Sequence, residues 1–124
     1  MNKKLIYEDL TYKVIGSLFE VYNRLGFGYK EKVYQEALAK ELQQVGLKFK
    51  RESHSSIRYK GYRVGSNFYD FLIESKIVLE LKVGNEIYES HAKQLLSYLH
   101  DSKMKLGILA VYCPKGVVYK RLVN

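Results

Sequence analysis

The feature of this sequence that most constrains its fold is a pair of apolar segments, Asn67–Ile73 and Ile77–Val83, separated by only three residues. Both segments are rich in β-branched and large apolar residues, and the intervening Glu74-Ser75-Lys76 has the length of a hairpin loop. The pair therefore predicts two antiparallel strands. Apart from two charged residues, Ile77–Val83 is apolar throughout, which is typical of a strand buried on both faces.

The rest of the chain shows helical or strand-like patterns on either side of this hairpin. Apolar residues recur every three or four positions in three segments, which predicts helices, and three further segments have the pattern of strands. The predicted helices are Ile6–Leu25, about Tyr29–Val45 and about Glu89–Ser102; the further strands are Leu47–Tyr59 (irregular around Ser53–Ser56), Leu106–Cys113 and Val117–Val123; and turns are expected at Lys60-Gly61, Gly65-Ser66 and Pro114-Lys115-Gly116.

The resulting element order, α-α-β-β-β-α-β-β, predicts an α/β (α+β) fold in which helices flank a central mixed β-sheet. The sequence contains no internal repeat and no linker. Its 124 residues fit one hydrophobic core, because single cores typically run to about 100–150 residues. We therefore expect a single domain over residues 1–124.

Several classes of protein are excluded by what the sequence lacks. No apolar run approaches the roughly 20 residues that a membrane span needs. The basic start, Met1–Leu5, leads into an amphipathic segment carrying Glu8 and Asp9, which is not the pattern of a signal peptide. The single cysteine, Cys113, excludes an internal disulfide and a cysteine-based zinc site. A cytoplasmic location is the expectation.

The charge balance points to a polyanionic partner. Lysine and arginine number 21 against 13 acids, a formal net charge of +8. Nucleic acid is the first expectation and an anionic membrane surface the second, so we expect nucleic acid rather than a membrane as the partner. Tyrosines near basic residues fit a nucleic-acid groove and a dimer interface equally well. These tyrosines are Tyr59, Tyr62, Tyr69 and Tyr88, and the basic residues are Arg58, Lys60 and Arg63.

Three charged residues interrupt the apolar hairpin. Side chains alternate along a strand, so Glu80 and Lys82 share one face of Ile77–Val83. If Ile73 pairs with Ile77, counting outward places Asp70 directly opposite Glu80. Carboxylates so placed have Cβ atoms about 5 Å apart. At an effective dielectric near 20 their repulsion is about 3 kcal/mol.

A divalent cation between the two carboxylates would remove this conflict. Hard ions such as Mg²⁺ or Mn²⁺ bind carboxylates and fill their remaining positions with water and phosphate oxygens. Lys82 would then orient or deprotonate the attacking water, or hold the phosphate. The alternative is a structural ion pair in which Lys82 neutralises Glu80 or Asp70.

The last predicted helix adds two polar residues. Gln94 and Tyr98 are spaced i and i+4, so they lie one above the other beside the apolar stripe. An amide and a phenol suit holding a water or a phosphate oxygen without adding charge. The alternative is a half-buried polar flank.

Asp70, the tripeptide Glu80-Leu81-Lys82 and the Gln94–Tyr98 element, in this order and spacing, resemble the PD-(D/E)XK nuclease superfamily. The Gln-x-x-x-Tyr element resembles its RecB-like branch. The segment Gly28–Tyr34 is similar to the signature of the small bacterial GxxExxY family, which is placed in that superfamily. The resemblance covers nearly the whole chain and implies a restriction-endonuclease-like core.

The resemblance also implies roles for individual residues. Asp70, Glu80 and the backbone carbonyl of Leu81 would be metal ligands, and Lys82 would be the catalytic lysine. Gln94 and Tyr98 would orient water or the scissile phosphate. Glu31 resembles an extra helical acid that completes the metal site; the alternative is a favourable charge in the first turn of a helix. The proline of the superfamily name is absent, because Tyr69 precedes Asp70.

Three hypotheses for function follow. The first is a nuclease dependent on Mg²⁺ or Mn²⁺ that cleaves nucleic acid, with DNA favoured. The second is a catalytically silent nucleic-acid-binding or accessory module that keeps the nuclease fold. The third is an interaction protein that dimerises through its tyrosines. A homodimer is also possible under the first hypothesis, because cutting both strands of a duplex would need a partner subunit or two visits.

Overall fold

The computed structural model describes residues 6–124, with only the backbone described at residue 53. The expectation for the basic start, Met1–Leu5, lies outside these residues. Within them the elements follow the predicted order. They are α1 (Glu8–Leu25), α2 (Glu31–Gln44), β1 (Phe49–Tyr59), β2 (Tyr62–Ile73), β3 (Ile77–Val83), α3 (Glu89–Ser102), β4 (Leu106–Cys113) and β5 (Gly116–Val123).

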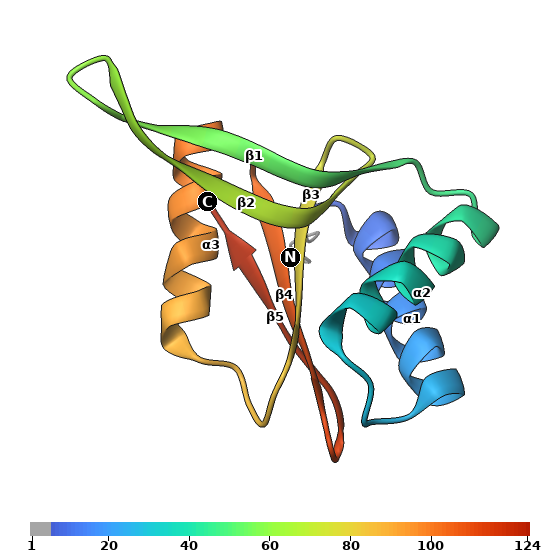
Figure 1. The fold of residues 1–124 in the computed structure, drawn as a ribbon. Helices are drawn as coiled ribbons and strands as arrows, with labels where there is room; N and C mark the ends of the chain where they lie inside the picture. The colour runs from blue at the N-terminus through green and yellow to red at the C-terminus, as the bar shows by residue number, and fades with distance from the viewer. Residues whose placement is uncertain (1–5) are drawn as a thin grey trace, which may run out of the picture.

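The strands form one mixed sheet in the order β1-β2-β3-β4-β5. Neighbouring strands are antiparallel, except that β3 and β4 are parallel and are connected through α3. Figure 1 shows α1 and α2 on one face of the sheet and α3 on the other. The α+β fold with a mixed sheet flanked by helices is therefore confirmed. No helix among residues 6–124 is long and apolar enough to cross a membrane.

Two hydrophobic cores lie on the two faces of the sheet. Leu79 and its odd-numbered neighbours in β3 belong to the larger core, with residues of α1 and α2. Val78 faces the smaller core, with Leu95 and other residues of α3. Gly107 of β4 allows this second contact, because a Cβ there would lie 3.0 Å from the Leu95 side chain. The α3 face is thus packed closely at one end of the strands.

The structure corrects the prediction for the region before Asn67. Gly65-Ser66 is not a turn, because β2 begins at Tyr62 and runs through it. The two-residue turn at Lys60-Gly61 closes the hairpin, with φ of 49° and 83°, the left-handed conformation of tight hairpin turns. Gly65 pairs with Ile57 beside a shift in register, so the ribbon accommodates it. Leu47–Tyr59 is otherwise a strand as expected, beginning at Phe49.

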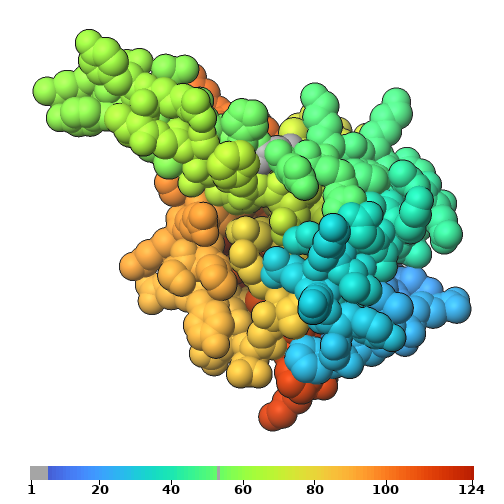
Figure 2. Space-filling view, in the orientation of Figure 1, coloured from blue at the N-terminus to red at the C-terminus, as the bar shows by residue number. Residues whose placement is uncertain are grey.

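The β1–β2 hairpin continues beyond the point where β2 stops pairing with β3. Only three residues of β2 pair with β3, and the last pair is Phe71 with Leu79. Residues 54–68, which we call the hairpin arm, pair only between β1 and β2. In Figures 1 and 2 the arm passes across α3 and its tip projects from the body of the molecule.

Candidate active site

The candidate site lies where β2 separates from β3. Ile73 pairs with Ile77, as the sequence predicted, and the pairing ends at Phe71 and Leu79. Asp70 and Glu80 are the next positions in the same register. Instead of continuing the ladder, the Asp70 carboxylate accepts a hydrogen bond from the Leu81 N–H, with Oδ2 and N 2.7 Å apart. The Asp70 side chain therefore satisfies a backbone group that β2 has left.

A reversal of β2 at this point explains the separation. Phe71 belongs to the core of α1 and α2, whereas Tyr69, two residues earlier, packs in the core of α3. Residues two apart on a regular strand share one face, so the β1–β2 ribbon turns over between them. This turn sets Asp70 into the opening between β2 and β3.

Glu80 is nearly buried and only half satisfied. Its exposed fraction is 5%, and its Oε1 lies 3.5 Å from Lys82 Nζ. Its Oε2 is buried without a hydrogen-bond partner. The ion pair that the sequence analysis gave as an alternative is thus present. It does not satisfy the whole carboxylate, and a buried carboxylate oxygen without a partner is costly.

Burial and mutual repulsion make both carboxylates reluctant to ionise. Burial raises the pKa of Asp70, and the field of Glu31 raises it further, although the Leu81 N–H and Lys82 act in the opposite direction. Burial also raises the pKa of Glu80; Lys82 opposes this shift, and the charges of Asp70 and Glu31 add to it. The single lysine does not compensate for this cluster of acids, whereas a divalent cation would.

The start of α2 supplies the third acid, Glu31, and an amide, Gln35. The sequence indicated Glu31 but not Gln35. Glu31 is the first residue of α2, and its charge acts on both Asp70 and Glu80. Gln35, one helical turn later, faces Asp70 and acts to lower the pKa of its carboxyl. The spacing i and i+4 places both on one helix face. Glutamine is common on helix surfaces, so only the spacing from Glu31 could have indicated its role.

These residues fit a hard cation in part. Among residues 6–124, no three acidic, histidine or cysteine side chains are close enough to form a complete ligand set. The unpartnered Oε2 of Glu80 and the Asp70 carboxylate are nevertheless the oxygen donors that Mg²⁺ prefers, and Mg²⁺ needs only one or two carboxylates. The C=O of a strand residue points to the same edge as its N–H, so the Leu81 carbonyl faces the opening beside Asp70.

Comparisons with protein families and solved structures identify the family and the fold of this chain. The family model of the PD-(D/E)XK nuclease superfamily matches residues 8–121, nearly the whole chain. The chain belongs to the PD-(D/E)XK nuclease superfamily. A solved structure titled "Crystal structure of SSO0001" is similar in fold, with a TM-score of 0.59 and 14% sequence identity over 98% of this chain and 78% of that chain. A search of curated proteins found no significant match.

Membership of the superfamily bears on how the acids at Asp70 and Glu80 are interpreted. PD-(D/E)XK nucleases generally use divalent metals and act on nucleic acid. Among the described residues, Asp70 and Glu80, beside the point where β2 leaves β3, offer oxygen donors to such an ion. In Figure 2 atoms of the segment around β3, in yellow, are visible between α3, in orange, and α2, in blue-green.

Gln94 and Tyr98 do not reach the acids directly. Tyr98 is buried, with its ring centroid 3.8 Å from that of Tyr69, and burial raises its pKa. The Gln94 side chain is exposed, and its backbone carbonyl accepts a hydrogen bond from the Tyr69 hydroxyl at 3.2 Å. Among the described residues, no hydrogen bond joins either side chain to Asp70, Glu80 or Lys82. Tyr69, which stands where the superfamily name has proline, thus connects α3 to the site.

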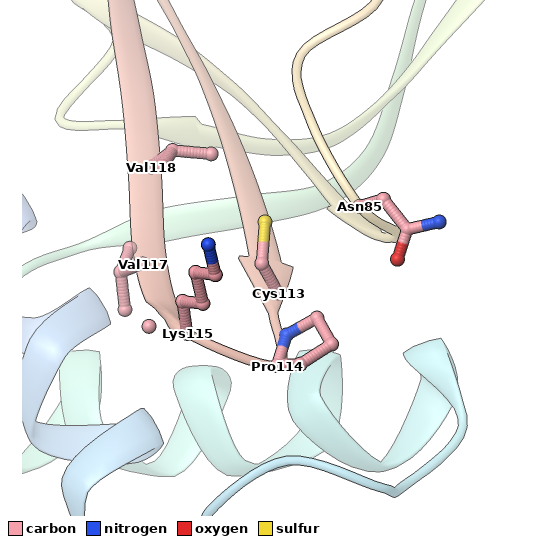
Figure 3. Close-up of a pocket in the computed structure, with 7 residues that line it drawn as sticks. Asn85, Cys113, Pro114, Lys115, Val117 and Val118 are labelled. Atoms are coloured by element: carbon pink, nitrogen blue, oxygen red, sulfur yellow. The ribbon is translucent and has the colours of Figure 1, made fainter.

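A separate pocket lies beside the C-terminal end of β4. It has a volume of about 340 Å³ and is formed mainly by the turn between β4 and β5 (Figure 3). Cys113, Val118 and Lys115 line it, and Asn85 closes one side. None of the acids of the candidate site belongs to it, and its walls are mostly apolar. This pocket is therefore separate from the candidate site in the opening between β2 and β3.

Proposed function

We propose that this chain is a divalent-metal-dependent nuclease that hydrolyses phosphodiester bonds in nucleic acid, with DNA favoured. The observation that carries the proposal is that Asp70 and Glu80 are the next positions beyond the last β2–β3 pair, and the charge of Asp70 raises the pKa of Glu80. Both carboxylates have a raised pKa, and one Glu80 oxygen has no partner. The net charge of +8 supports a polyanionic substrate.

The residues that would hold Mg²⁺ or Mn²⁺ are Asp70, Glu80 and the backbone carbonyl of Leu81, with Glu31 as an additional acid. When bound, such an ion would supply Lewis acidity and would lower the pKa of a coordinated water. Gln35 and the Leu81 N–H would hold the Asp70 carboxylate in one orientation. Glu31, at the start of α2, would also hold water by its free carboxylate oxygens.

Lys82 is the residue proposed to act on the nucleophile. Its side chain is 29% exposed, and its ammonium lies 3.5 Å from Glu80. From this position it would orient the attacking water or hold a phosphate oxygen. Gln94 and Tyr98 would orient water or the scissile phosphate, and Tyr98 would do so only after a change in its packing on Tyr69. Gln94 and Tyr98 support membership of the RecB-like branch, and the segment Gly28–Tyr34 supports membership of the GxxExxY family within the superfamily.

Cleavage of a mixed panel of DNA and RNA by the purified protein tests this proposal. We expect cleavage that requires Mg²⁺ or Mn²⁺, and a loss of about a thousandfold or more in Asp70→Asn and in Lys82→Ala, because a catalytic metal supplies several kcal/mol of charge stabilisation. The matched controls are Asp9→Asn on α1 and Lys93→Ala on α3, two exposed residues outside the site. Cleavage that persists in both site variants would refute the assignment.

A catalytically silent nucleic-acid-binding module is the second candidate, because the Lys82–Glu80 ion pair already neutralises part of the site. This candidate predicts binding that weakens with salt, no hydrolysis with any divalent metal, and little effect of Glu80→Gln on binding. The same panel distinguishes the two, since only the nuclease produces metal-dependent fragments.

A further inference from the structure

The hairpin arm combines several exposed apolar side chains with basic residues. Its tip carries Tyr59 and Tyr62, which are 61% and 74% exposed. Phe68, nearer the body, is 62% exposed. Exposed aromatic rings so concentrated are unusual on a surface without a partner. The two tyrosines also face each other as the last cross-strand pair before the turn, so their rings lie on one face of the ribbon.

The arm is also free of negative charge. Residues 54–68 contain three fixed cations and no acid, although the whole chain has 13 acids. Lys60 lies with its ammonium 5.4 Å from the Tyr59 ring centroid, on the aromatic face. Arg58 and Arg63 pair one position before the tyrosines, on the opposite face of a thin ribbon. At physiological salt the charges of Arg58 and Arg63 attract a phosphate only when it lies within the Debye length of about 8 Å.

The arm leads directly into the candidate site. Strand β2 runs without interruption from Tyr62 at the tip to Asp70. At about 3.3 Å per residue, these two positions are about 26 Å apart along the strand. A flexible polyanion held at the tip would therefore extend along the ribbon toward Asp70.

We propose that the hairpin arm binds single-stranded nucleic acid by stacking bases on Tyr59 and Tyr62 while Lys60 contacts the backbone. Stacking on exposed rings requires unpaired bases, which a duplex does not offer. The arm thus selects a single-stranded segment and guides it to Asp70 and Glu80. This inference rests on the proposed nuclease function, because guiding a strand to Asp70 and Glu80 has a purpose only if the chain cleaves nucleic acid. The stacking itself is measurable without any cleavage.

The test measures the affinity of the full chain for a labelled oligothymidylate of about 16 nucleotides, the upper end of single-strand site sizes. The assay contains EDTA, so neither the metal nor hydrolysis affects the result. We expect Tyr59→Ala/Tyr62→Ala to weaken binding about tenfold or more, and Tyr12→Ala to leave it unchanged. Tyr12 is a matched control, because it is an 81% exposed tyrosine on α1.

Two further measurements separate stacking from charge. The sequence has no tryptophan, so Tyr62→Trp introduces a single reporter at the tip. We expect its fluorescence to be quenched by the oligothymidylate and that of Tyr12→Trp to remain unchanged. In Arg58→Gln/Lys60→Gln/Arg63→Gln, the slope of log affinity against log salt should decrease by up to about 2, since each contact to a single strand contributes about 0.7.

The outcomes distinguish this inference from the proposed function. Wild-type affinity in Tyr59→Ala/Tyr62→Ala, an unquenched Tyr62→Trp, or equally tight binding of a blunt duplex would overturn the role of the arm, even if metal-dependent cleavage is found. Loss of binding in the arm variants without any cleavage would support the arm and reject the nuclease. A dimer that these variants dissociate, with unchanged affinity for the oligonucleotide, would overturn the arm's role in favour of self-association.

Discussion

The two faces of β3 differ in what they bury: one is entirely apolar, and the other carries two charged residues. On the face toward α1 and α2, Ile77, Leu79 and Leu81 are completely buried in the larger core. On the face toward α3, Val78 is buried in the same way, but Glu80 and Lys82 follow it. Residues next to each other in sequence therefore have opposite energetic roles.

The difference teaches where this fold tolerates unfavourable charge. The larger core is continuous, so its free energy of burial supports the whole sheet. The core on the α3 face is smaller, and the pairing of β2 with β3 ends at Phe71. The opening left there holds carboxylates whose pKa values are raised by burial, an arrangement that stability alone does not favour.

The largest expected effect on stability is on the apolar face. Leu79→Ala removes a fully buried side chain between β3 and the helices, and we expect the free energy of unfolding to fall by about 2–5 kcal/mol. Denaturant unfolding followed by circular dichroism measures this loss. A cost well below this range would mean that the core is not continuous at Leu79, and the contrast between the faces would fail.

On the other face of β3, Glu80→Gln should raise the free energy of unfolding rather than lower it. Because the pKa of Glu80 is raised in the folded state, the folded protein binds its proton more tightly than the unfolded chain. Stability therefore decreases as pH rises from the ordinary value of 4.5 through the raised pKa. We expect Glu80→Gln to have a higher free energy of unfolding than wild type at pH 7. We also expect its free energy of unfolding to decrease less steeply as the pH rises.

Unfolding of wild type and Glu80→Gln at a series of pH values between about 4 and 8 measures this difference. The exposed Glu86→Gln is the matched control and should follow wild type. A Glu80→Gln protein that is less stable than wild type at pH 7 would show that the ion pair with Lys82 outweighs the burial of the carboxylate.

The smallest expected effect sharpens the separation between the faces. The buried Tyr112 hydroxyl donates to the Leu18 carbonyl at 2.6 Å, in the core of α1 and α2. Tyr112→Phe should lower the free energy of unfolding by about 1 kcal/mol. Nucleic-acid cleavage at a temperature where the variant is folded should be unchanged. Reduced cleavage by the folded variant would mean that this core also positions the site.

Much of the fold could be predicted from local patterns. The three-residue loop at Glu74–Lys76 set the register of β2 and β3, and this register located Asp70 opposite Glu80. Membership of the PD-(D/E)XK superfamily was indicated by the same residues and is confirmed by the family match. Short-range spacing was sufficient here because a hairpin places nearby residues together.

The remaining features depend on tertiary structure. The sequence predicts a turn at Gly65-Ser66 because glycine and serine favour turns, whereas in the structure a shift in register accommodates Gly65 within β2. Tyr98 is buried because β2 turns over and brings Tyr69 against α3. The contact between Gln35 and Asp70 joins α2 to β2, which no local pattern reveals.

Calorimetric titration of the wild-type protein with Mn²⁺ tests the central claim most directly, because Asp70 and Glu80 are proposed to bind one divalent cation. We predict a single binding event that is lost in both Asp70→Asn and Glu80→Gln and is retained in Asp9→Asn. Absence of Mn²⁺ binding by the folded wild-type protein, or undiminished binding by Glu80→Gln, would contradict the account.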